Sequence, residues 1–185
     1  AVDMADAYAT FAARGQQAAP TVVTRVVGAN AGLLYEAEPR TVSAFDPDTA
    51  DTVTYALGKV VTEGTAFAAR ALGRPAAAKT GTTDDNKSAW FVGYTPQLAT
   101  AVLMAKEDAD GLPVSLSGTG GLATVTGGSF PAAIWTAFMK AALANLPVLD
   151  FPAPPPGVAV PRNCPASLSS PDEPVPAGCP TPPVV

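Results

Sequence analysis

Histidine is absent from this sequence of 185 residues. An imidazole provides the general base of Ser-His-Asp triads, the base of Cys-His sites and the commonest side-chain ligand of metal ions. The chain on its own therefore excludes these mechanisms and most zinc sites. We therefore expect a function that uses neither a metal ion nor a cofactor.

Basic runs and long apolar runs are also missing. Eleven Lys and Arg residues stand against sixteen Asp and Glu residues, which gives a net charge of -5. Because nucleic-acid binding needs a clustered basic surface, this composition argues against a nucleic-acid partner. No apolar stretch approaches the roughly 18 to 20 residues that cross a bilayer, and no secretory signal opens the chain. Any anchor or export signal would therefore lie outside these residues.

The start of the chain predicts an amphipathic helix. Met4, Tyr8 and Phe11 recur at helical spacing, and Gly15 is a typical residue to end a helix. Because the helix begins with the first residues, we expect this chain to be a piece of a longer domain.

Two further elements are indicated before residue 75. Two β-rich runs flank residues 30–32, Asn-Ala-Gly, where Asn and Gly permit the positive φ of a tight turn, and predict a hairpin. A helix should follow, with Asp46 as its N-cap and Pro47 at its first position. It should end near Gly64, with a short helical turn through Ala71. Its apolar stripe would consist of Val53, Leu57, Val60 and Val61.

The second half of the chain predicts a sheet covered by a helix. Three β-type runs at 76–83, 89–95 and 98–107 are joined by short loops, which favours an antiparallel meander. A helix that begins with Pro131 would cover this sheet, and the class is therefore α+β, with an antiparallel sheet flanked by helices. Its apolar face would consist of Ile134, Trp135, Phe138, Met139, Ala142 and Leu143.

Composition divides the chain into a domain at 1–146 and a tail at 147–185. The tail holds thirteen of the 20 prolines and has no periodicity, so we expect an extended, partly polyproline II conformation. The only two cysteines, Cys164 and Cys179, both lie in it. A disulfide between them would stabilise the closed loop by roughly 3 kcal/mol and would place the chain outside the reducing cytosol. Two free thiols are the alternative.

Lys79 lies in a stretch, "GRPAAAKTGTTDD", that superficially matches a phosphate-binding loop. Such a loop needs a glycine directly before the lysine, so that backbone N–H groups can curl around phosphate. Here Ala78 occupies that position, and Pro75 removes a backbone donor. The segment that follows also resembles a strand rather than a helix, which argues against phosphate binding.

As a strand, the same stretch offers a different chemistry. Lys79 and Gly81 would face one way, and Thr80 and Thr82 the other. An exposed strand edge can pair with an extended peptide, while lysine and threonine can bind its terminal carboxylate. A polar strand end that leads into a turn is the alternative interpretation.

The neighbouring residues suggest structural roles. Asp84 and Asp85 are adjacent in a loop and face different ways, so we expect a turn rather than paired catalytic carboxylates. We assign five aromatic side chains to core packing, namely Trp90, Phe91, Tyr94, Trp135 and Phe138.

Several segments, two of which overlap at Lys79, together resemble the penicillin-binding proteins. They are "MADAYATFA", "VVTEGTAFAARALGRPAAAKTGT", "KTGTTDDNKSAWFVGYTP" and "GGSFPAAIWTAFM". The resemblance covers Ala1 to about Leu146 and is to the second half of the transpeptidase domain in bifunctional, class A proteins of the actinobacterial type. It implies the C-terminal part of the fold shared with serine β-lactamases.

The resemblance also implies site roles. Lys79 would supply positive potential, and Thr80, Thr82 and, more weakly, Thr83 would bind the substrate carboxylate beside Gly81. The N–H of Thr82 would form half of an oxyanion hole. The family's other two motifs, Ser-x-x-Lys with the nucleophile and Ser-x-Asn, are both absent from this sequence. We therefore expect an N-terminal part of the same domain to carry the serine, and this chain alone to be inactive.

The function implied by the resemblance is that of a peptidoglycan D,D-transpeptidase. Its partners would be the peptidoglycan stem peptide and β-lactam antibiotics, and its place would be extracytoplasmic, at the cell membrane through an upstream anchor. A D,D-carboxypeptidase or a serine β-lactamase are alternatives within the same superfamily. A non-catalytic module that binds a peptide at the edge near Lys79 is the alternative from another class.

Overall fold

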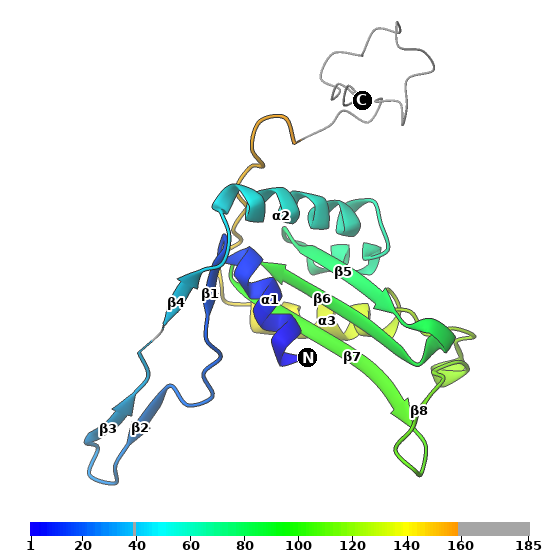
Figure 1. Cartoon of the computed structure of the whole chain (residues 1–185), viewed down its shortest axis with the longest axis horizontal. Helices are drawn as coiled ribbons and strands as arrows, with labels where there is room; N and C mark the ends of the chain where they lie inside the picture. Colours follow the sequence, from blue (N-terminus) through cyan, green and yellow to red (C-terminus); the bar gives the residue numbers. More distant parts are fainter. Residues whose placement is uncertain (39, 159–185) are drawn as a thin grey trace, which may run out of the picture.

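A computed structural model of the chain describes residues 1–38 and 40–158 (Figure 1). Cys164 and Cys179 lie outside the described residues, as does most of the expected tail at 147–185. The disulfide and the division at residue 146 therefore stay predictions.

An antiparallel meander forms the centre of the molecule, as the sequence predicts. Its strands are β5 (Ala77–Thr82), β6 (Ser88–Thr95), β7 (Leu98–Glu107) and β8 (Pro113–Val114), in the order β5-β6-β7-β8. β5 therefore lies at one edge of this sheet. The register places Lys79 opposite Val92 and Gly81 opposite Trp90.

Three helices surround the sheet. α1 (Val2–Ala12) crosses one face of it, and α3 (Phe130–Ala142) covers the other, while α2 (Pro47–Thr62) packs beside β5 (Figure 1). The short η1 helix (Phe67–Leu72) leads from α2 into β5. This arrangement confirms the α+β class. Within the described part of the chain, no helix is both long and apolar enough to span a bilayer.

The contact between Trp135 and Gly93 holds α3 against the sheet. Trp135 is fully buried, its indole N–H donates to the Gly93 carbonyl at 3.2 Å, and its ring lies 5.1 Å from that of Phe91. A Cβ atom at Gly93 would lie 3.0 Å from the Trp135 ring and 2.9 Å from the Ala78 Cβ atom. The close packing of helix and sheet therefore requires glycine at this position.

The buried face of α3 is narrower than its apolar sequence suggests. Ile134 and Phe138 are 49% and 51% exposed, so the assignment of Phe138 to the core is wrong, and Ala142 is exposed too. Successive residues are about 100° apart around a helix, which turns 134 and 138 away from the face of their neighbours. That face contacts the sheet through Ala132, Trp135, Met139 and Leu143.

The buried face of α2 is more polar than expected. Val53, Leu57 and Val60 are only partly buried, whereas Asp51 and Thr54 are buried. The reason is that both find partners: the Arg14 guanidinium donates two hydrogen bonds to the Asp51 carboxylate, at 3.1 and 2.7 Å, and Thr54 shares one of 2.8 Å with the Tyr94 hydroxyl. Buried polar groups are stable only with such partners.

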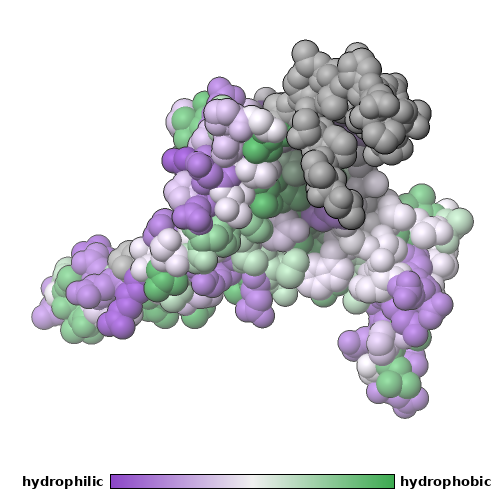
Figure 2. Space-filling model, turned by 45° about the horizontal axis from the view of Figure 1, so that its top comes forward, coloured by the Kyte–Doolittle hydropathy of each residue, from purple (hydrophilic) through white to green (hydrophobic). Residues whose placement is uncertain are grey.

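A two-stranded arm projects from this body (Figure 1). β1 (Gln16–Ala18) pairs with β4 (Thr41–Ser43), and β2 (Arg25–Val27) pairs with β3 (Leu33–Glu36), which confirms the predicted hairpin. The positive φ in its turn is adopted by Ala31, at 62°, rather than by the neighbouring Asn or Gly. Figure 2 shows hydrophobic patches along the arm, where Leu34 is 70% exposed.

The Gly93 contact gives a first prediction. Gly93→Ala should lower the free energy of unfolding by about 1 to 3 kcal/mol, because the added Cβ atom would lie too close to the Trp135 ring. Urea denaturation of the chain measures this change. Gly58→Ala, in α2, is the control: its Cβ atom meets nothing within 4 Å, and it should stabilise by about 1 kcal/mol. A Gly93→Ala variant with the same free energy of unfolding as the parent chain would contradict the packing argument.

Tyr94 gives a second prediction, on pH. Burial raises the pKa of Tyr94 to about 12 from 10.0, against a smaller opposing effect of the hydrogen bond with Thr54. Below pH 10 the phenol is protonated in the folded and unfolded states, whereas between about 10 and 12 only the unfolded state loses the proton. Stability should therefore fall as the pH rises through this window. Thermal unfolding measures this effect. The loss of stability in this pH window should be smaller in Tyr94→Phe than in the parent protein. It should be unchanged in Tyr35→Phe, because Tyr35 is exposed.

Candidate functional site on the edge strand β5

Lys79 projects from the edge strand on the side of α1. It lines a cavity of about 240 Å³ together with Met4 and Tyr8 of α1 and Trp90 and Val92 of β6. Its ammonium group donates to the Thr80 carbonyl at 2.7 Å. The side chain is exposed and forms no ion pair within the described residues, so its positive charge is available to an anion.

The two threonine hydroxyls lie on the other face of β5. Thr80 shares a hydrogen bond of 2.6 Å with the hydroxyl of Thr65, and the Thr82 hydroxyl accepts one from the Gly127 N–H at 3.4 Å. The alternation along β5 thus separates the lysine from the threonines, as the sequence predicts. The strand offers an ammonium group on one side and hydroxyls on the other, along one sheet edge.

Gly127 explains how the loop before α3 comes so close to this edge. A Cβ atom at Gly127 would overlap the Trp90 carbonyl oxygen and would lie 2.9 Å from the Gly81 nitrogen. Only a residue without a side chain can therefore lie directly on β5 and β6 here. Gly81 is less constrained, because its own Cβ atom would meet only that of Trp90, at 3.4 Å.

The residues after β5 form a turn. The Thr83 hydroxyl accepts a hydrogen bond from the Ser88 N–H at 2.8 Å, so it is engaged within the turn. Asp84 begins the short η2 helix (Asp84–Asn86), and Asp85 has a φ of 57°. The expected turn role of the two aspartates is confirmed. In the described part of the chain, no three Asp, Glu, His or Cys side chains lie together as potential metal ligands.

Trp90 and Asn86 have roles that the sequence does not reveal. Trp90 is half-buried and lines the Lys79 cavity, whereas Phe91 and Tyr94 are fully buried, so only the latter two are core residues as predicted. The Asn86 amide donates to the Val125 carbonyl at 2.6 Å and accepts from the Val125 N–H at 3.1 Å. This buried clamp fixes the loop that carries Gly127, and no local pattern in "DDNKS" distinguishes it.

Comparison with known proteins finds matches among the penicillin-binding proteins. The family model for the penicillin binding protein transpeptidase domain matches residues 1–119. Penicillin-binding protein 1A of Mycolicibacterium smegmatis is 38% identical over 162 residues, which cover 83% of this chain and 20% of that protein. The chain therefore spans about one fifth of the length of the curated relatives that it matches.

Solved structures agree with these sequence matches. The penicillin-binding protein PonA1 from Mycobacterium tuberculosis matches with a TM-score of 0.69 at 37% identity, over 83% of this chain and 40% of that chain. The D,D-transpeptidase domain of a peptidoglycan glycosyltransferase from Eggerthella lenta matches with a TM-score of 0.61 at 25% identity, over 79% of this chain and 33% of that chain.

The Asn86 clamp gives a third prediction. Asn86→Ala leaves the N–H and the carbonyl of the buried Val125 without a partner, which should destabilise the chain by about 2 kcal/mol. In Asn86→Ala, the rate of amide hydrogen exchange should increase at Val125 and Gly127, and it should increase less in β6. Asn30→Ala, in the exposed turn of the arm, is the matched control and should change neither amide. Equal exchange in both variants would show that the clamp does not hold the loop.

Proposed function

This chain belongs to the penicillin-binding protein transpeptidase family, and from that premise we propose that it forms the C-terminal part of a D,D-transpeptidase domain. Such a domain cross-links the stem peptides of peptidoglycan and is acylated by β-lactams. The observation that carries the proposal is the edge of β5 beside which no other described strand lies, and which presents Lys79, Thr80 and Thr82 beside Gly81. The relative from Eggerthella lenta, described as a D,D-transpeptidase domain, supports it.

In the proposed reaction, a serine on a preceding segment attacks the peptide carbonyl between two D-alanine residues. The terminal D-alanine leaves with its amine protonated, and an acyl-enzyme ester remains. The amine of a second stem peptide then attacks this ester, forms the new peptide bond and returns the proton to the serine. In a β-lactam the leaving amine stays attached to the opened ring, so the ester persists.

The β5 edge would bind and polarise the substrate during these steps. The hydroxyls of Thr80 and Thr82 would donate hydrogen bonds to the carboxylate of the stem peptide or antibiotic, and the ammonium group of Lys79, on the other face of the strand, would supply positive potential at the same edge. The Thr82 N–H would form half of an oxyanion hole, where one donor contributes about 3 kcal/mol of transition-state stabilisation. The other half and the nucleophile would come from the preceding segment.

The other edge of the sheet supports a larger domain. β7 pairs with β6 from Leu98 to Ala105, and with β8 only at Lys106 and Glu107. Within the described residues, the outer edge of β7 from 98 to 105 therefore has no strand beside it. Helices α1 and α3 nevertheless contact β7, as they would contact an inner strand. A strand of the preceding segment would satisfy this edge.

The proposed setting is extracytoplasmic, at a membrane anchor upstream of this chain. Within the same superfamily, a carboxypeptidase or a β-lactamase would differ in one step, because water rather than an amine would resolve the acyl-enzyme. Product analysis with a stem peptide and an acceptor amine separates these outcomes: a cross-linked dimer supports the transpeptidase, and only hydrolysed peptide contradicts it.

Lys79 provides the fourth prediction, to be tested in the full-length protein that contains this chain. Lys79→Ala should slow acylation by a fluorescent penicillin by about 100-fold or more, because it removes the positive potential that favours the carboxylate and supports proton transfer. Lys87→Ala is the matched control, since Lys87 lies 3.7 Å from Asp85 on the exposed turn and should be neutral.

Stopped-flow labelling and a thermal melt of each variant complete this test. A variant that melts normally but is labelled slowly would support the role of Lys79. Equal labelling rates for Lys79→Ala and the parent protein would contradict it, and reversible binding without a covalent label would favour the peptide-binding module.

A further inference from the structure

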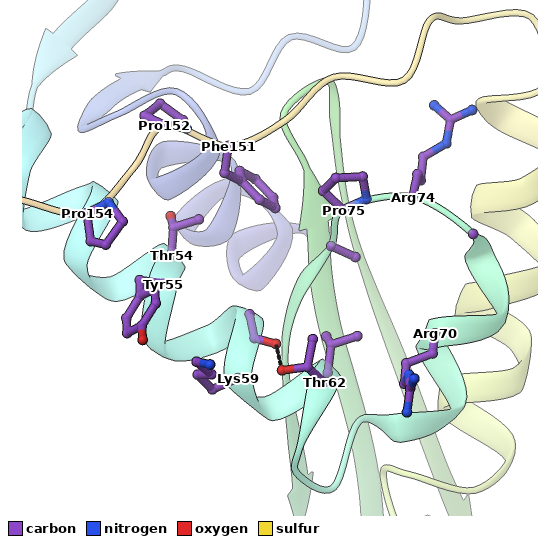
Figure 3. A pocket seen from close by; sticks show the side chains of 14 residues that line it. Thr54, Tyr55, Lys59, Thr62, Arg70, Arg74, Pro75, Phe151, Pro152 and Pro154 are labelled. Carbon is purple, nitrogen blue, oxygen red and sulfur yellow. Dashed lines mark hydrogen bonds between the residues drawn. The ribbon is translucent and has the colours of Figure 1, made fainter. Parts of the chain in front are cut away.

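A second cavity lies between α2, the residues that lead into β5, and the chain after α3. It has a volume of about 560 Å³ and is lined by α2, by residues 70–76 and by residues 151–154 (Figure 3). We call it the α2 groove and define it by Tyr55, Gly58, Lys59, Arg70, Arg74 and Phe151. Its size is that of a ligand site, and it shares no residue with the Lys79 cavity.

The groove carries rings and prolines at one end, beside Lys59 with its acidic partner, and two arginines at the other. Figure 3 shows Tyr55, Phe151 and Pro154 gathered at one end, and Arg70 and Arg74 at the opposite end. Among the described residues, no aspartate or glutamate lines it. A ligand that fills the groove would therefore meet rings at one end and positive charge at the other.

Within the described residues, no carboxylate pairs with either of the two arginines. Arg74 donates to the carbonyls of Leu143, Leu146 and Pro147 at 3.0 to 3.5 Å, so its position is fixed while its charge remains. The Arg70 guanidinium lies 4.7 Å from the centre of the Phe67 ring. The arginine end thus favours an anion.

Lys59 lies beside Tyr55, away from the arginines, and it already has an acidic partner. Its ammonium group donates to Glu63 at 3.1 Å and lies 5.4 Å from the centre of the Tyr55 ring. We therefore place the anionic group of a ligand at the arginines and not at Lys59.

Gly58 keeps the groove open. It lies inside α2, where glycine is less favourable than alanine, and a Cβ atom there would meet nothing within 4 Å. The space above Gly58 is therefore part of the groove and not a packing contact. A large side chain at this position would fill the groove without displacing a neighbour at its Cβ atom.

From this geometry we propose that the α2 groove binds an elongated amphiphilic anion. Its apolar body lies against Tyr55, Phe151 and Pro154, and its acidic group lies beside Arg70. The site is separate from the proposed transpeptidase site and does not depend on it.

A pair of dyes tests the proposal in the full chain of 185 residues. The probes are 8-anilinonaphthalene-1-sulfonate and the uncharged N-phenyl-1-naphthylamine, which have nearly the same apolar body. The sulfonate should bind with one site per chain and at least tenfold more tightly than the uncharged dye. Equal affinities, no saturable binding, or more than one equivalent site would overturn the proposal.

Two matched pairs of variants locate the site. Arg70→Gln should weaken sulfonate binding about tenfold and leave the uncharged dye within twofold, whereas Arg25→Gln, on the arm, should change neither. Gly58→Phe should abolish binding of both dyes, and Gly58→Ala should retain it. In the full-length protein, Gly58→Phe should keep the penicillin acylation rate within twofold, which separates this site from the proposed function. Unchanged dye binding in Gly58→Phe, with a normal thermal melt, would contradict the assignment.

Discussion

The packing of Trp135 against Gly93 is the contact on which the rest of this structure depends. Because Gly93 has no side chain, the indole ring reaches the surface of the sheet and donates to the Gly93 carbonyl. This contact holds α3 against β6, while α1 covers the opposite face. The sheet is thereby fixed between two helices, and β5 is left at its edge with a defined register to β6.

The chemistry of β5 follows from this position. Ala77 and Ala78 at its start are buried, while Lys79 and Thr82 further along are exposed, so one strand passes from the core to the surface. The core end fixes the backbone, and the exposed end presents polar groups along an edge that no other described strand covers. The Asn86 clamp and the close approach of Gly127 add rigidity on the threonine face. A pre-positioned edge of this kind suits the proposed binding of an extended peptide with a terminal carboxylate.

The sequence predicts those parts of this fold that depend on local patterns. The meander follows from three β-type runs with short loops, and the start of α2 follows from Asp46 and Pro47. Contacts between distant residues are not predictable in this way. The pair of Thr54 and Tyr94 reverses the expected polarity of α2, and the exposure of Phe138 depends on where α3 meets the sheet. At the site, the motif around Lys79 is readable from the sequence, but the clamp at Asn86 joins residues 39 apart.

The central claim is that β5 binds the substrate of a serine nucleophile that lies outside this chain. The most direct measurement is to label the full-length protein with a fluorescent penicillin, digest it and identify the acylated residue by mass spectrometry. The account predicts a single adduct on a serine in the segment that precedes residue 1. An adduct on any residue within this chain, such as Ser115 or Ser117, would contradict it.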